Sequence, residues 1–204
     1  MKPNPTPQTL REIGGLPAKP ARLDESVVII VDAQKEYSEG ALPLWGLNAA
    51  VREIEVLLAR ARAANTPVFH IVQHSRRGGR VFAPDGPFVA IFDELKPLEG
   101  EKVVVKSLPS SFKLTTLEVE IRKTGRKNLV VVGFMTHMCV NSTVRDAAEM
   151  GYACTVVANA CATRDLPDGH GGTISAEAVH VANLAALRDR FAVVVDAAND
   201  LPAQ

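Results

Sequence analysis

Residues 27–32 of this chain are Val-Val-Ile-Ile-Val-Asp, five consecutive β-branched apolar residues that end on one acid. The run is far shorter than the roughly 20 apolar residues of a membrane-spanning helix, and its composition is typical of a strand. A strand that is apolar at every position, instead of at every second one, is expected to be buried on both faces. Such strands belong to parallel sheets with helices on each side, so this stretch predicts an α/β fold.

The rest of the chain repeats this pattern, because short apolar runs alternate with longer amphipathic segments. Strands separated by helices imply right-handed crossovers and a parallel sheet between two helical layers. The expected strands are residues 27–31, 68–72, 103–105, 129–132, 153–157 and 192–195, and the expected helices are residues 47–64, 117–123, 140–150 and 175–190.

The length of 204 residues favours one domain, since domains typically have roughly 100–200 residues. The N-terminal segment is different in composition, because proline is excluded from helix interiors and is frequent there. We therefore expect residues 1–22 to form an extended arm on the body or on a neighbouring subunit, and residues 23–204 to form the domain. The five prolines of the arm are Pro3, Pro5, Pro7, Pro17 and Pro20.

The charges of the chain balance, with 23 Lys and Arg against 23 Asp and Glu. No net field attracts the chain to nucleic acid or to a membrane surface, so neither is expected as a partner. The three cysteines are an odd number without a CxxC pair, which favours a reducing, cytoplasmic compartment. The first residues also lack the apolar segment of a secretory signal, which agrees with that expectation.

Three chemically reactive residues follow expected strands. Asp32 ends the first strand and Lys106 ends the third, while Cys139 follows the fourth within residues 133–140, Gly-Phe-Met-Thr-His-Met-Cys-Val. Sites in parallel sheets collect beyond the carboxyl ends of the strands. Cys139 also lies near the start of a helix, where backbone N–H groups and the helix dipole favour a thiolate. An acid that takes the thiol proton and a lysine that stabilises negative charge make this set a candidate nucleophilic triad.

The other cysteines and histidines have ordinary structural explanations. Cys154 lies within an expected strand and is expected to be buried packing, and Cys161 has no acid–base pair beside it. His70 and His74 are four residues apart on or just after a strand, a separation of about 13 Å that is too long for one metal ion. His70 is therefore expected to be a core or subunit-contact residue.

Three motifs in order along the chain resemble the isochorismatase-like cysteine hydrolases, a family that includes nicotinamidases, N-carbamoylsarcosine amidase and ureidoacrylate amidohydrolases. Asp32-Ala33-Gln34 with Tyr37 is similar to the family's D-x-Q followed by an aromatic residue. Lys106 with Ser111-Phe112 is similar to its K-x-x-x-S-A-F segment, and residues 133–140 match G-x-x-T-x-x-C-V. The resemblance covers residues 27–196 and leaves the N-terminal arm outside.

The resemblance implies a three-layer α/β/α fold whose six-stranded parallel sheet has the Rossmann-like order 3-2-1-4-5-6. It implies a catalytic triad of Asp32, Lys106 and Cys139. It also implies a cis peptide bond between Phe134 and Met135, with the N–H groups of Met135 and Cys139 as an oxyanion hole. Members of the family are commonly dimers or tetramers, so we expect a homo-oligomer.

The expected reaction is hydrolysis of a C–N bond in a small-molecule amide or ureide, through a thioester on Cys139. True isochorismatases cleave a vinyl ether and lack this cysteine, so vinyl-ether hydrolysis is one alternative. A thiol-based redox or ligand-binding protein on the same frame is another. The nicotinamidase metal site needs an Asp-x-His pair, and no histidine lies between Asp32 and His70. Neither a metal nor a cofactor is therefore expected.

Substrate contacts are expected from the loops after the first three strands and from the turn before Cys139. An aromatic residue after the Lys106 segment would wall a small planar ligand, which favours Phe112. His137 could contact substrate or cover the site. The group of Arg76, Arg77 and Arg80 could anchor an anion, although a solvated loop is the more ordinary interpretation. The candidate substrate-binding residues are Gln34, Tyr37, His74, Phe112 and His137.

Overall fold

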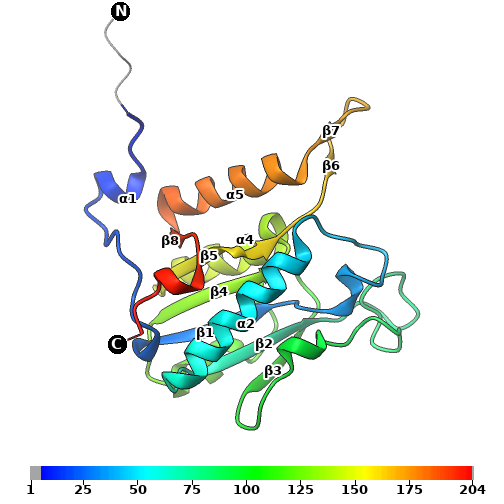
Figure 1. The fold of residues 1–204 in the computed structure, drawn as a ribbon, viewed down its shortest axis with the longest axis horizontal. Helices are drawn as coiled ribbons and strands as arrows, with labels where there is room; N and C mark the ends of the chain where they lie inside the picture. The colour runs from blue at the N-terminus through cyan, green and yellow to red at the C-terminus, as the bar shows by residue number, and fades with distance from the viewer. Residues whose placement is uncertain (1–5, 204) are drawn as a thin grey trace, which may run out of the picture.

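Helices cover both faces of one central parallel sheet (Figure 1). A computed structural model describes residues 6–203 of the chain. The sheet has six strands in the order β3-β2-β1-β4-β5-β8. Because β8 is the sixth strand expected from the sequence, the predicted fold and strand order are confirmed. The strands are β1 (Ser26–Val31), β2 (Val68–Gln73), β3 (Lys102–Lys106), β4 (Asn128–Phe134), β5 (Ala153–Ala162) and β8 (Ala192–Val195).

Strand β1 lies in the middle of the sheet, between β2 and β4. All six of its residues are buried. Val28 and Ile30 belong to one apolar cluster, while Val27, Ile29 and Val31 belong to the cluster on the other face. Both faces are covered, which is why the sequence is apolar at every position. Each such side chain contributes roughly 1.5–3 kcal/mol when it is fully buried.

Different helices cover the two faces of the sheet. One apolar cluster contains residues of α2 (Leu47–Ala63), which crosses in front of the sheet in Figure 1. The cluster on the other face contains residues of α3 (Leu117–Lys123), α4 (Asn141–Glu149) and α5 (Ala176–Arg190). The expected helices are found with ends shifted by at most one residue, if the turn before α4 is set aside. Short helical turns are η1 (Leu23–Glu25), η2 (Lys35–Tyr37), η3 (Asp93–Leu95), η4 (Thr136–Val140) and η5 (Ala198–Asp200).

The described part of the N-terminal arm, from residue 6 onward, contacts the body but is not extended throughout. Residues Leu10–Ile13 form a single helical turn, α1, between two of the prolines. Thr9 and Glu12 cap it reciprocally, because each side chain accepts a hydrogen bond from the other residue's backbone N–H. The backbone N–H of Leu10 donates to Asp189 of α5 at 2.8 Å, which ties the arm to the body. Pro3 and Pro5 lie outside the described residues.

A small hairpin between β5 and α5 was not expected from the sequence. It consists of β6 (Leu166–Pro167) and β7 (Thr173–Ile174), and it projects away from the sheet in Figure 1. Strand β5 also runs to Ala162, beyond the expected end, with an irregularity in its pairing with β4. The sequence hid this extension because alanines and one asparagine interrupt the apolar run.

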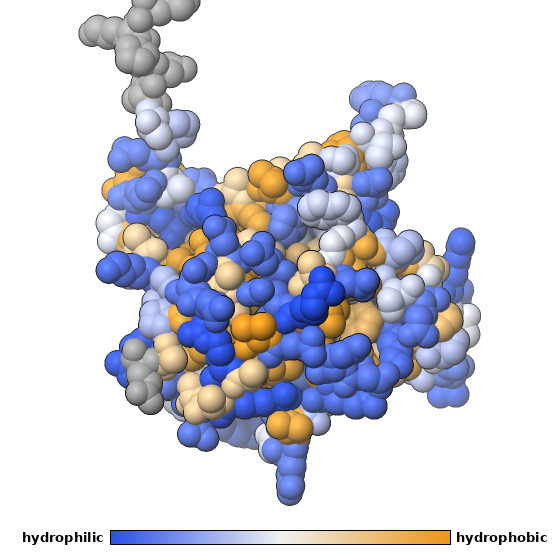
Figure 2. Space-filling view, viewed as in Figure 1, coloured by the Kyte–Doolittle hydropathy of each residue, from blue (hydrophilic) through white to orange (hydrophobic). Residues whose placement is uncertain are grey.

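The face seen in Figure 2 is mostly hydrophilic, with apolar residues dispersed over it. Among residues 6–203, no helix has the length and apolar character that crossing a membrane requires.

Gly133 lies where β4 pairs with the end of β1, and a substitution there tests how closely the two strands approach each other. Its φ is +112°, and an added Cβ would lie 2.7 Å from the backbone nitrogen of Val31. Gly151 also has a positive φ, +87°, but its Cβ would meet nothing within 4 Å. We expect Gly151→Ala to lose about 1–2 kcal/mol of unfolding free energy, and Gly133→Ala to lose about 1–3 kcal/mol more from the clash. Equal losses in urea unfolding would contradict this account of the strand contact.

Candidate active site

Asp32, Lys106 and Cys139 meet at the carboxyl edge of the sheet. The Nζ atom of Lys106 lies 2.7 Å from Oδ2 of Asp32 and 3.4 Å from Sγ of Cys139. The three residues are only 0%, 2% and 7% exposed, respectively. Three groups far apart in sequence therefore form one buried cluster after β1, at the end of β3 and after β4.

Gln73, which sequence analysis missed, holds the lysine from the end of β2. Its Oε1 accepts a hydrogen bond from Lys106 Nζ at 2.6 Å. The backbone N–H of Gln73 donates to Oε1 of Gln34 at 2.8 Å, and Gln34 in turn donates to the carbonyls of Gln73 and Val89. The amide of Gln34 thus donates to two backbone carbonyls and accepts from one backbone N–H, and its role in substrate binding stays a prediction. Its position after the first strand gave no sign of these partners.

Asp32 is fully buried and has a left-handed φ of +50°. Neither carboxylate oxygen has an aligned hydrogen-bond donor among the described residues, so its contact with Lys106 is an ion pair without directed hydrogen-bond geometry. Burial raises the pKa of Asp32 to about 6, although the positive charge of Lys106 opposes the shift. A carboxylate that is ionised at neutral pH and has a raised pKa is suited to accept a proton.

The thiol of Cys139 is neutral in this environment. Burial raises its pKa to about 12, the negative charge of Asp32 acts in the same direction, and Lys106 opposes both. Desolvation thus opposes the preference for a thiolate that is expected at the helix start. The resting site holds its proton on sulfur, beside an ionised acid that can take it.

The turn that carries Cys139 leads directly from β4 into α4. The peptide bond between Phe134 and Met135 is cis. Residues Thr136–Val140 then form η4, a π-helical turn that continues into α4 without a break. The Met135 carbonyl accepts hydrogen bonds from the N–H groups of Met138 and Val140. Met135 and Cys139 are thus set at the two ends of one tight turn.

The two aromatic candidates lie in apolar packing. Tyr37 is 1% exposed and packs edge-on against Phe82 and Phe134, with ring centroids 5.3 and 5.6 Å away. Burial and the charge of Asp32 raise its pKa, so Tyr37 forms a buried wall near the acid. The ring of Phe112 stacks on Tyr152, which precedes β5 at the opposite end of the sheet. Phe112 thus packs against Tyr152, and the expectation that it walls the ligand stays a prediction.

The two histidine candidates flank the cluster. His74 is half-buried, and its backbone N–H donates to the carbonyl of Lys106. His137 is half-buried two residues before Cys139, with Nδ1 2.6 Å from Oγ1 of Thr163. Both remain candidates for substrate contact. The basic loop fits a solvated surface, because Arg76, Arg77 and Arg80 are exposed and Arg77 pairs with Asp85 at 3.7 Å.

Arg164 is a further candidate that sequence analysis missed. Its Nε is buried and has no partner among the described residues, while Nη1 donates to the carbonyl of Asp165. Its positive charge acts to lower the pKa values of His137 and Tyr37, which places the guanidinium near both. An arginine just after a strand is indistinguishable from a solvated loop residue by sequence alone.

His70, Cys154 and Cys161 are all buried in the core. His70 is buried with Nε2 2.9 Å from Oε2 of Glu101, so it is a core residue. Cys154 and Cys161 are buried free thiols. In the part of the chain from 6 to 203, no three His, Cys, Asp or Glu side chains gather as metal ligands would.

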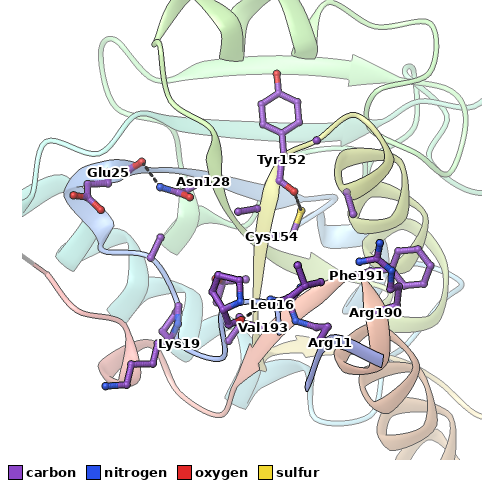
Figure 3. Close-up of a pocket in the computed structure, with 17 residues that line it drawn as sticks. Arg11, Leu16, Lys19, Glu25, Asn128, Tyr152, Cys154, Arg190, Phe191 and Val193 are labelled. Carbon is purple, nitrogen blue, oxygen red and sulfur yellow. Dashed lines mark hydrogen bonds between the residues drawn. The ribbon is translucent and has the colours of Figure 1, made fainter. Parts of the chain in front are cut away.

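A cavity of about 490 Å³ lies between the N-terminal arm and the amino ends of β4, β5 and β8 (Figure 3). It is lined by Arg11, Cys154 and Arg190, among others. The amino ends of parallel strands are opposite the edge that holds Asp32 and Cys139. Chemistry, and not the size of a cavity, therefore identifies the candidate active site.

Comparison with known proteins identifies the same fold. Residues 26–199 match the isochorismatase domain. The crystal structure of an isochorismatase from Pseudomonas putida superposes with a TM-score of 0.91 at 41% identity, covering 96% of this chain and all (100%) of that one. A secreted isochorismatase effector of Verticillium dahliae is 40% identical over 92% of this chain and 96% of its own length.

Other similar proteins have names that state the kind of reaction they catalyse. A cysteine hydrolase from Pseudomonas syringae superposes with a TM-score of 0.84 at 28% identity, covering 96% of each chain. The ureidoacrylate amidohydrolase of Rhizobium rhizogenes is 29% identical over 72% of this chain and 75% of its own length. A streptothricin hydrolase of Streptomyces noursei is 32% identical over 69% of this chain and 50% of its own length.

Removing the lysine tests whether the buried ion pair is real. Breaking such a pair by deleting one partner typically costs about 3–5 kcal/mol, because the other charge is left uncompensated. We expect Lys106→Met to lose this much unfolding free energy at pH 8. The loss should shrink at pH 5, because the pKa of Asp32 is already about 6 and rises further without the lysine. Below that pKa the acid is protonated and no charge is left unpaired.

Lys102→Met is the matched control, since Lys102 lies on the same strand and forms a surface pair with Glu120 at 3.0 Å. It is expected to lose at most about 1 kcal/mol at both pH values. A loss for Lys106→Met that is small, or that does not depend on pH, would argue against the pair.

Proposed function

The chain belongs to the isochorismatase family of hydrolases, and from this premise we propose that it is a cysteine-dependent hydrolase of a C–N bond in a small amide or ureide. The observation that carries the proposal is the buried contact of Lys106 with both Asp32 and Cys139. Binding alone gives no reason to surround a thiol with an acid and a lysine. The relatives named as a cysteine hydrolase and a ureidoacrylate amidohydrolase support the same chemistry.

The first half of the reaction forms a thioester. Sγ of Cys139 attacks the carbonyl carbon while its proton passes to the carboxylate of Asp32. The backbone N–H groups of Met135 and Cys139 donate to the oxyanion, where each donor of this kind typically contributes about 2.7–4 kcal/mol. Lys106, 3.4 Å from the sulfur, stabilises the negative charge that develops there. Collapse breaks the C–N bond, and Asp32 returns its proton to the departing amine or ammonia.

The second half releases the acid. Asp32 takes a proton from water, and the hydroxide adds to the thioester carbonyl. Collapse of this intermediate breaks the C–S bond, and the proton held by Asp32 returns to the sulfur of Cys139. The site is thereby restored to a neutral thiol beside an ionised acid, which is the resting state that the two shifted pKa values favour.

The two alternative functions are less well supported. Vinyl-ether hydrolysis of the isochorismatase type does not use the cysteine. Thiol redox chemistry depends on thiolate character and exposure. Cys139 is 7% exposed and its pKa is raised to about 12, and both properties slow oxidation.

The setting of the enzyme is proposed to be a reducing, cytoplasmic compartment, where its three free thiols stay reduced. We also propose that it works as a dimer or tetramer. Edge strand β3 supports this, because its Val103 and Val105 are each 50% exposed and offer an apolar surface to another copy.

The substrate is proposed to carry a carboxylate or a similar acceptor group that binds Arg164. A buried guanidinium nitrogen without a partner is costly unless a ligand supplies an acceptor. Arg164 is the arginine whose Nε meets that description among the described residues. It follows β5, which lies beside the strand that leads to Cys139.

Replacing the nucleophile tests the proposed reaction. Cys139→Ala is expected to abolish ammonia release from a panel of small amides, N-carbamoyl amino acids and ureido acids. Cys154→Ala, which removes a buried thiol within β5, is the matched control and should retain activity. Mass spectrometry of the wild-type enzyme with a turned-over substrate should reveal an acyl adduct on Cys139. Full activity of Cys139→Ala would refute the mechanism.

Replacing the arginine tests the substrate class. A charge-assisted hydrogen bond contributes roughly 1.5–3 kcal/mol, or about 10–100-fold in affinity. Arg164→Met should therefore raise KM about 10–100-fold for a carboxylate substrate and much less for its neutral methyl ester. Arg80→Met, which changes an exposed arginine of the basic loop, is the control and should alter neither. Equal effects of Arg164→Met on acid and ester would rule out the anchor.

A further inference from the structure

Helix α5 holds the turn of Cys139 at both of its ends. Thr136, three residues before the cysteine, has Oγ1 2.9 Å from Nδ1 of His180. Asn141, two residues after it, donates from Nδ2 to Oδ1 of Asn183 at 3.1 Å. His180 and Asn183 are three residues apart on α5, so they project from the same face of that helix.

The first contact has a defined direction. The single proton of the Thr136 hydroxyl is donated to the carbonyl of Ala162 at 3.1 Å, so this oxygen accepts from His180. This hydrogen-bond pattern assigns the ring proton of His180 to Nδ1. Burial lowers the pKa of His180, which keeps the ring neutral at neutral pH. Added acid would protonate Nε2 and leave the Nδ1 donor in place.

The second contact is equally complete. Oδ1 of Asn141 accepts from Nε of Arg145 at 2.7 Å, which leaves the Asn141 amide nitrogen to donate to Asn183. The amide nitrogen of Asn183 donates to the carbonyl of Val179 at 2.8 Å. The guanidinium of Arg145 lies 4.2 Å from the ring centroid of Phe191, just after α5. These contacts link Arg145, Asn141, Asn183 and Val179 in one series of hydrogen bonds.

The position of these contacts matters because η4 is a π-helical turn, a form that is rare and needs support from its surroundings. The sulfur that it carries must stay within reach of Lys106 and Asp32. A misplacement of about 1 Å at a reacting group can reduce the rate about 100-fold.

We propose that His180 and Asn183 are positioning residues, which keep Cys139 against Asp32 and Lys106 by holding Thr136 and Asn141. Neither residue touches a reacting atom. The effect on turnover rests on the proposed hydrolase function, whereas the effect on the thiol itself does not. Loosening the turn exposes the sulfur, so the thiol becomes more reactive towards an added reagent while the enzyme becomes slower.

The test compares alkylation with turnover. Iodoacetamide modification of Cys139 is followed by mass spectrometry across pH in the full-length protein. His180→Ala is expected to raise the alkylation rate at pH 8 at least about tenfold, as the pKa of the thiol falls towards the ordinary value of about 8.5. Its kcat should fall about 10–100-fold, with KM changed less than threefold. Cys154 and Cys161 should stay unmodified, which separates local release of the turn from unfolding.

Conservative variants of His180 distinguish a role of its hydrogen bond in positioning the turn from a role of its ring in packing. The Nδ2 atom of an asparagine can take the place of the histidine Nδ1, whereas the amide of a glutamine lies one carbon further out. His180→Asn should therefore restore slow alkylation and fast turnover, and His180→Gln should not. Val181→Ala, at a neighbouring position that is 60% exposed, should behave as wild type. Asn183→Ala should give the same signature as His180→Ala.

A double-mutant cycle tests whether His180 acts through Thr136. Thr136→Val keeps the shape of the side chain but removes the hydroxyl. If the proposal holds, the double variant Thr136→Val/His180→Ala loses no more kcat than Thr136→Val alone. The proposal would be overturned if the kcat losses of the two single variants multiplied in the double variant. An unchanged alkylation profile in His180→Ala would also overturn it. Because alkylation needs no substrate, this result is independent of whether any amide is hydrolysed.

Discussion

The buried pair of Asp32 and Lys106 is the constraint on which the site depends. Two fully buried charges are tolerated only when they face each other, because the desolvation of either alone costs several kcal/mol. The parallel sheet brings them together, since β1 and β3 end at the same edge on either side of β2. Gln73, at the end of β2, accepts a further hydrogen bond from the ammonium group of the lysine. The fold therefore supplies both charges and the partner that orients one of them.

This pair also sets the protonation of the nucleophile. With Asp32 ionised, a second negative charge on Cys139 is disfavoured, and burial acts in the same direction. The thiol consequently rests neutral, next to a carboxylate whose oxygens have no other aligned donor. In the proposed mechanism the sulfur gains charge only as it attacks and passes its proton to Asp32. Such a cysteine is protected from oxidants and still lies beside its base.

The fold could be predicted well because the spacing of apolar residues and the polar residues at strand ends are local signals in the sequence. Asp32 and Lys106 stood out because each ends an apolar run, and a charged group there needs a partner. The direction of Phe112 was not readable, because it depends on Tyr152, which arrives from another strand. The hydrogen-bond partners of Gln34 were not readable for the same reason, since they come from two distant segments. The capping box of α1 was readable at Thr9 and was overlooked among the prolines.

The polar groups that remain without partners narrow what the site can recognise. Among the described residues, the buried side-chain atoms in this state belong to Asp32, His70 and Arg164. His70 already contacts Glu101 on the core side of β2, away from the strand ends. In the proposed mechanism Asp32 serves the proton transfer, so Nε of Arg164 is left as the buried donor that lacks an acceptor among the described residues. Under the proposed function, a substrate that brings an acceptor to Nε of Arg164 and a carbonyl to Cys139 satisfies both groups at once, whereas a substrate without such an acceptor leaves this nitrogen unpaired. Specificity for anionic amides or ureides would then follow from the same rule that holds the ion pair together: a buried polar group needs a partner.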